Sequence, residues 1–205
     1  MGLNVNKKRK AFWLKQLHQW HWVSSALCLI SLLLFSITGI TLNHANDIPA
    51  DPVTQPLEGQ LPDSLLIVLN QRQSGPLPAP VQQWLDQEFA LDSTGKEAEW
   101  APDEVYVALP RPGGDAWLAI TLDSGELMGE VTDRGWIAFF NDLHKGRHTG
   151  TVWFWFIDVF AVASLLFALT GLGLMFLHAK RRPATWPVTL AGLVIPWLLI
   201  IFFMH

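Results

Sequence analysis

The chain has 205 residues, half of them hydrophobic, with a formal net charge of −4 and a mean hydropathy of +0.25. This hydropathy is high for a soluble domain and is typical of a small protein with a few membrane spans. The one cysteine, Cys28, lies within an apolar run, which excludes an intrachain disulfide framework and a cysteine zinc site. Any bound metal would need histidine or carboxylate ligands.

Basic and acidic residues are segregated along the chain. Eight of the 14 Lys and Arg residues flank the apolar runs, at positions 7–15 and 180–182. The segment between the first two apolar runs has six basic against 17 acidic residues, a net charge of −11. Because Lys and Arg are enriched on the cytoplasmic side of membrane helices, we expect a cytoplasmic N-terminus and a periplasmic segment over residues 45–149.

The first apolar run predicts an uncleaved membrane helix. Residues 1–22 are expected to form a basic cytoplasmic N-terminus and the interfacial start of this helix, whose span covers residues 23–44. The run has about 20 residues, enough to cross a bilayer, and no small-residue cleavage site follows it. Residues 46–62 are rich in Pro, Asp and Gln and are predicted to be an extended linker.

Residues 45–132 are predicted to contain a small α+β domain. Helices are expected directly after Pro62 and over residues 80–89. Alternating patterns separated by turn-forming sequences predict strands over residues 104–109, 116–122 and 127–131. A domain of this size can bury one face of a sheet under its helices.

The rest of the chain returns to the membrane. Thr132 and Asp133 are predicted to cap an interfacial helix within residues 133–149, which is apolar on one side. A second span is predicted over residues 150–178, a basic cytoplasmic loop over 179–187 and a third span over 188–205. The sequence therefore predicts a membrane protein with three transmembrane helices and a periplasmic α+β domain between the first two.

Histidines are concentrated at the ends of the first two spans. The expected cytoplasmic set contains His18, His21 and His178. The expected outer set contains His44, His144 and His148. A single interfacial histidine commonly has no role beyond tolerating the boundary. Here each set draws imidazoles from two antiparallel helices at the same depth, which is the arrangement that ligates haem iron from both faces. We therefore predict bis-histidine binding of haem b, with one or two haems per chain.

A site for a divalent ion is the competing interpretation of the outer set. His144 and His148 are four residues apart, and on one helical face they could share an ion, with His44 or an acidic side chain completing the site. This interpretation leaves the cytoplasmic set unexplained.

Two Thr-Gly pairs and one acid accompany the histidines. Thr38-Gly39 and Thr170-Gly171 precede His44 and His178, and Gly there would let a porphyrin edge approach the backbone; ordinary helix packing is the alternative. Asp158 is the only acid within a span and lies about 15 Å deeper than His148. It is interpreted as a group near a haem propionate, a proton relay or a helix–helix hydrogen bond. Two haems at opposite ends of a span would lie far apart, since 23 residues separate His21 from His44.

The motifs LHQWHW, TGITLNH, DLHKGRHTG and TGLGLMFLH, in this order, resemble those of the PepSY-associated transmembrane helix proteins. The intervening DEVYVALPRPGGDAWLAITLDSGELMGEV resembles a PepSY domain, and the resemblance covers roughly residues 14–182. Relatives include haem-containing ferric-siderophore reductases of the bacterial inner membrane. The resemblance implies that His18, His44 and His144 occupy the recurring histidine positions, with His178 at the end of the second span and His21 and His148 as extra or alternative ligands.

The same resemblance implies an activity and partners. Electrons would pass from a quinol or a cytoplasmic reductase to a ferric chelate or siderophore in the periplasm. The larger relatives have four or more spans, and a homodimer could complete the electron path of this three-span chain. No nucleic-acid partner is expected. The sequence contains no Ser-His-Asp, CxxC or phosphate-loop signature that would indicate a different chemistry. The alternative from a different class is a non-catalytic membrane-anchored PepSY module that binds or regulates a partner.

Overall fold

The structure is a computed structural model that describes residues 2–49 and 51–204. It divides into two compact units. Unit 1 combines the chain up to Leu34 with the chain from Phe156 onward, and unit 2 contains residues 35–155. Met1, predicted to lie in the cytoplasmic N-terminus, and His205, predicted to end the third span, lie outside the described residues.

Within the described part of the chain, three helices are long and apolar enough to cross a membrane: α1 (Gly2–Asn43), α5 (Gly150–His178) and α6 (Thr185–Phe203). The predicted number of spans is confirmed, and the second span has the predicted bounds. The first helix is much longer than its predicted span, because the basic stretch before residue 23 is also helical. Lys, Arg, Gln and Leu are good helix formers, and neither Gly nor Pro interrupts residues 3–38.

The link between α5 and α6 is shorter than predicted. A single 3₁₀ turn, η1 (Ala179–Arg181), follows α5, and α6 begins three residues before the predicted position 188. Pro187 therefore lies in the first turn of α6, where a missing backbone N–H costs no hydrogen bond.

Unit 2 is built on a five-stranded antiparallel sheet with the strand order β1-β5-β4-β3-β2. The three predicted strands correspond to β3 (Glu104–Ala108), β4 (Gly114–Thr121) and β5 (Glu126–Asp133). Two strands were not predicted: β1 (Val53–Gln60), which lies in the segment expected to be a linker, and the short β2 (Ala98–Trp100). The linker prediction was wrong because β1 is polar and contains Pro56, features that an edge strand tolerates.

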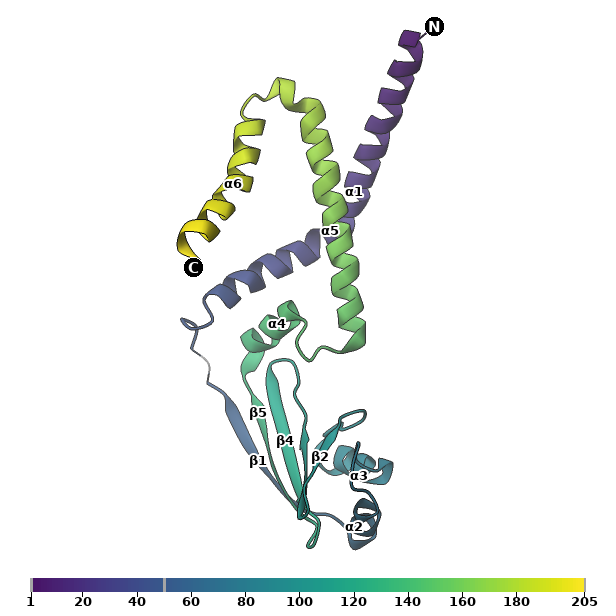
Figure 1. The fold of residues 1–205 in the computed structure, drawn as a ribbon, viewed down its shortest axis with the longest axis vertical. Coiled ribbons are helices and arrows are strands. Elements are labelled where there is room, and N and C mark those ends of the chain that lie inside the picture. Colours follow the sequence, from purple (N-terminus) through teal and green to yellow (C-terminus); the bar gives the residue numbers. More distant parts are fainter. Residues whose placement is uncertain (1, 50, 205) are drawn as a thin grey trace. The chain divides into compact units, whose positions relative to one another are not determined.

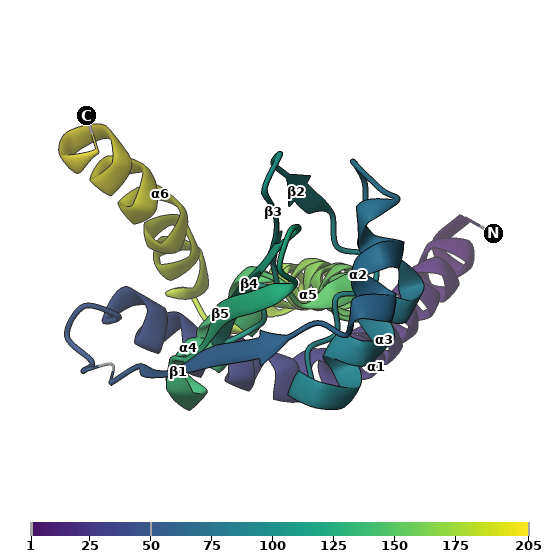
Figure 2. The same ribbon diagram turned by 90° about the horizontal axis from the view of Figure 1, so that it is seen from below.

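Helices α2 (Asp63–Asn70) and α3 (Ala79–Phe89) confirm the two predicted helices and lie on one face of the sheet (Figures 1 and 2). The core between them is made of small and medium aliphatic side chains, including Leu69, Val81, Leu85, Val107, Leu118 and Ile120. The alternation along β4 places Leu118 in this core and Trp117 on the opposite face, where it stacks on Tyr106 at a centroid distance of 6.0 Å.

Helix α4 (Gly135–Lys145) is the predicted amphipathic helix, but its start differs from the prediction. Thr132 and Asp133 belong to β5, and the N-cap residue is Arg134, with no capping hydrogen bond from its side chain. The helix begins one residue later than predicted, because pairing with β1 extends β5 to Asp133. Asp133 Oδ1 still accepts a hydrogen bond, at 2.7 Å, from the backbone N–H of Gly135 at the start of α4. The exposed apolar side chains of α4 are Trp136, Ile137 and Phe140.

Candidate histidine sites

His18 and His178 form a pair in unit 1. His18 extends from α1 and His178 is the last residue of α5, and both are exposed. Their ring centroids lie 6.2 Å apart, and the ring planes are nearly perpendicular, at 88°. The structure thus brings together two imidazoles from different helices.

The backbone selects the tautomer of the neutral ring in both residues. His18 Nδ1 lies 2.8 Å from the Leu14 carbonyl oxygen, and His178 Nδ1 lies 2.8 Å from that of Leu174. A carbonyl oxygen can only accept a hydrogen bond, so each Nδ1 carries the proton of the neutral ring. Each Nε2 then keeps a lone pair, which is the condition for binding a metal.

His21, also in unit 1, is held in a cradle on α5. Its Nδ1 lies 3.1 Å from Thr170 Oγ1, and its ring stacks on Phe167 at 4.8 Å and 14°. A Cβ added to Gly171 would lie 3.2 Å from His21 Cε1, so glycine allows the ring to lie close to the backbone. Thr170 is 8% exposed, and its hydroxyl donates to the Leu166 carbonyl at 2.6 Å, so Thr170 Oγ1 accepts the Nδ1 proton of His21.

His144 occupies a matching cradle in unit 2. Its Nδ1 lies 2.6 Å from Thr38 Oγ1, its ring lies 4.9 Å from the ring of Phe35, and its Cε1 would lie 3.6 Å from a Cβ on Gly39. Thr38 is 5% exposed and donates to the Phe35 carbonyl at 3.2 Å. Thr38 therefore accepts the Nδ1 proton of His144, as Thr170 accepts that of His21.

The two cradles share the sequence pattern Phe-x-x-Thr-Gly. It occurs as FSITG at residues 35–39 and as FALTG at residues 167–171. In each copy the Phe ring lies on the same helix face as the Thr hydroxyl and the glycine, because Thr follows Phe by three residues and Gly follows it by four. The Thr-Gly pairs were predicted to lie against a porphyrin or a neighbouring helix, and each receives a histidine from a neighbouring helix. The preceding Phe was missed, although its repetition was visible in the sequence.

The structure places His44 and His148 differently from their predicted grouping with His144. His44 follows the end of α1, is 55% exposed at its side chain and lies 3.1 Å from Asp47 Oδ2. Gly146 ends α4 with a left-handed cap, and His148 lies beyond it at a φ of 57°. His144 and His148 therefore do not share a helix face, because the helix ends between them.

The described residues offer no ready site for a divalent ion. Within residues 2–49 and 51–204, no group of three or more His, Cys, Asp and Glu side chains is placed to hold a metal. The divalent-ion site predicted at His144 and His148 therefore lacks a ligand group. Asp158 is exposed on α5, and among described residues it makes no hydrogen bond or ion pair.

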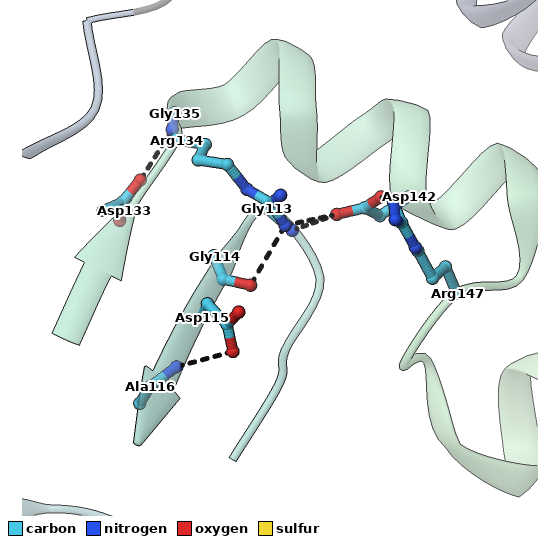
Figure 3. Close-up of polar contacts among 9 residues, drawn as sticks. All are labelled: Gly113, Gly114, Asp115, Ala116, Asp133, Arg134, Gly135, Asp142 and Arg147. Atoms are coloured by element: carbon cyan, nitrogen blue, oxygen red, sulfur yellow. Dashed lines mark hydrogen bonds and ion pairs between the residues drawn. The ribbon is translucent and has the colours of Figure 1, made fainter. Parts of the chain in front are cut away.

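Asp142 anchors the helix that carries His144 (Figure 3). This carboxylate is 6% exposed, and its Oδ2 accepts from the Gly113 backbone N–H at 2.9 Å. Arg134 lies 3.4 Å and Arg147 3.7 Å from the two oxygens of Asp142. A Cβ on Gly113 would lie 2.7 Å from the Cβ of Phe139, so the β3–β4 turn contacts α4 directly. The sheet and the histidine-bearing helix are therefore packed into one body.

The fold defines an integral membrane protein in which an antiparallel α+β domain follows the first of three membrane helices. Residues 12–205 match the PepSY_TM-like family, and the chain belongs to this family. The predicted relation to PepSY-associated transmembrane proteins is thereby confirmed. Comparison with curated proteins and with solved structures gives no match.

Proposed function

We propose that this protein binds haem b in the bacterial inner membrane and passes electrons to ferric iron held by a periplasmic chelate or siderophore. The observation that carries the proposal is the pairing of His18 with His178, two exposed imidazoles with free Nε2 atoms on different membrane helices. The charge segregation supports the orientation, because the basic flanks favour the cytoplasm and the acidic domain the periplasm.

The dimensions of the pair fit a shared haem iron. His18 and His178 would hold the haem iron through their Nε2 atoms, one from each of two helices. The centroid distance of 6.2 Å is short enough for both rings to reach one metal ion. Bound haem b would supply one-electron transfer. The hydrogen bonds from each Nδ1 to a carbonyl orient the two rings and raise their basicity as ligands.

The substrate side of the proposal follows from the chemistry of iron release. A chelate with hard oxygen ligands binds Fe(III) much more tightly than Fe(II), so gaining one electron weakens the complex. No nucleophile or general base is needed for this step. The electron donor would be a quinol or a cytoplasmic reductase on the side of His18 and His178.

Unit 2 contains candidate ligands for a second haem, but they are not arranged as a pair. His144 keeps a free Nε2 in its cradle, whereas His44 and His148 are exposed and lie outside the helices. A second haem would draw on these three residues, and a second copy of the chain in a homodimer could supply a missing ligand. We therefore propose one haem at His18 and His178, with unit 2 as the candidate site for another.

Reduced-minus-oxidised absorption spectra of the purified full chain test the proposal. We expect a Soret band and resolved α and β bands after dithionite reduction, typical of a low-spin haem. His18→Ala and His178→Ala should each remove this component, and Gln19→Ala, which replaces the exposed neighbour of His18 on α1, should keep it. A folded wild-type protein without a Soret band contradicts the proposal. Unchanged spectra of both ligand variants contradict the ligand assignment.

A second candidate function is a non-catalytic binding module. The sheet face opposite α2 and α3 carries the stacked Tyr106 and Trp117, and Met128 on the same face is 55% exposed. Aromatic residues and Met are enriched in protein interfaces. A colourless but folded protein in the spectral experiment would favour this function, with the helices serving as an anchor.

A further inference from the structure

The cradle around His21 belongs to the same helix contact as the proposed haem ligands. On α1, His21 lies one turn after His18; on α5, Thr170 lies eight residues before His178. Leu17 and His21 contact Gly173 and Gly171 of α5, so later residues of α1 meet earlier residues of α5 and the helices run antiparallel. A shift of one helix along the other would move the cradle and the His18–His178 pair together.

The ring of His21 is fixed on three sides. Thr170 Oγ1 accepts its Nδ1 proton, and the Phe167 ring covers one ring face. On a third side the ring lies close to Gly171, since a Cβ added to this glycine would be 3.2 Å from His21 Cε1. The Phe167 carbonyl oxygen, 3.3 Å from Nδ1, is a second acceptor for the same proton. His18 and His178, in contrast, are exposed and use only their own helix to hold Nδ1.

We infer that His21 is a positioning residue, and that its cradle on Thr170 sets the axial offset of α1 and α5 at which His18 and His178 can share one iron. This inference rests on the proposed haem function. Slipping one helix by a single residue moves its side chains by about 1.5 Å, whereas metal–ligand distances tolerate only about 0.2 Å. A hydrogen bond that selects one offset is therefore sufficient to decide whether the two ligands reach the iron.

Two pairs of variants separate positioning from ligation. Thr170→Val removes the closer acceptor with little change in shape and leaves only the Phe167 carbonyl, 3.3 Å from Nδ1. Thr170→Ser keeps both acceptors. His21→Ala removes the donor, whereas His21→Asn keeps an N–H group at the position of Nδ1 and is not a haem ligand. We expect the low-spin fraction of the reduced haem to fall several-fold in Thr170→Val and His21→Ala. Thr170→Ser and His21→Asn should retain it.

The outcomes distinguish this inference from the proposed function. If His21→Asn loses the low-spin spectrum as completely as His18→Ala does, His21 is a ligand and the inference is wrong. It is also wrong if Thr170→Val and His21→Ala both keep the wild-type spectrum. A wild-type protein without haem overturns the proposed function and, with it, the role of the cradle in haem binding.

A measurement without haem tests the cradle itself. In the haem-free full chain, the ring ¹⁵N chemical shifts of His21 should report a proton on Nδ1. Thr170→Val, which leaves only the Phe167 carbonyl as an acceptor, should weaken this preference. Thr170→Ser is the matched control and should keep it. A His21 ring protonated on Nε2 in the wild type contradicts the hydrogen bond from which the inference is drawn.

Discussion

Replacing Gly113 by Ala tests whether the β3–β4 turn is packed against α4. Gly113 has a φ of +70°, and a Cβ there would lie 2.7 Å from the Cβ and 2.8 Å from the Cα of Phe139. Gly95 provides a matched control, because it also has a φ of +70° but a Cβ added to it would meet nothing within 4 Å. Both alanine variants share the left-handed backbone strain, so their difference isolates the contact with α4.

The expected magnitudes follow from these two contributions. A non-glycine residue in the left-handed region costs roughly 1–2 kcal/mol, and both variants should lose this stability. Forcing a methyl group against helix backbone costs about 1–3 kcal/mol more, and only Gly113→Ala should lose it. For a chain of this size each kcal/mol lowers the unfolding midpoint by about 2–4 °C.

Thermal unfolding of the full chain in detergent, followed by circular dichroism, measures the difference. We expect Gly113→Ala to melt several degrees below Gly95→Ala, and Gly95→Ala to melt slightly below the wild type. Equal midpoints for the two variants would show that the turn does not contact α4. The packing of the sheet against the His144 helix would then be wrong.

Three further predictions use the same protein preparations. Asp142→Asn should lower the free energy of unfolding by about 1–2 kcal/mol. The amide can still accept one hydrogen bond, but it loses the charge-assisted contact with the half-exposed Arg134. A urea midpoint equal to that of the wild type contradicts this prediction. His144→Ala should cost about 0.5–1.5 kcal/mol through its lost hydrogen bond, and the matched His148→Ala should leave the urea midpoint unchanged. Asp158→Leu should leave the His18–His178 haem spectrum intact, and loss of the low-spin band would instead place Asp158 in the haem site.

Much of the architecture could be predicted from the sequence. Hydropathy and length are local properties, so the second span was predicted at its observed bounds, and strand alternation located β3, β4 and β5. Strand β1 was missed because its polar residues carry no alternation signal. It is a strand because β5 offers it eight paired positions, which is a tertiary property.

For the histidine sites, the sequence determined which residues lie near the span ends, and the tertiary structure decided their partners. His18 and His21 are three residues apart and were equal candidates for pairing with His178. The axial offset of α1 and α5 places His18 against His178 and His21 in the Thr170 cradle. The end of α4 at Lys145 likewise separates His148 from His144. Sequence spacing fixes positions along a helix, but the offset and rotation between helices depend on which side chains pack together, and those contacts assign each histidine its partner.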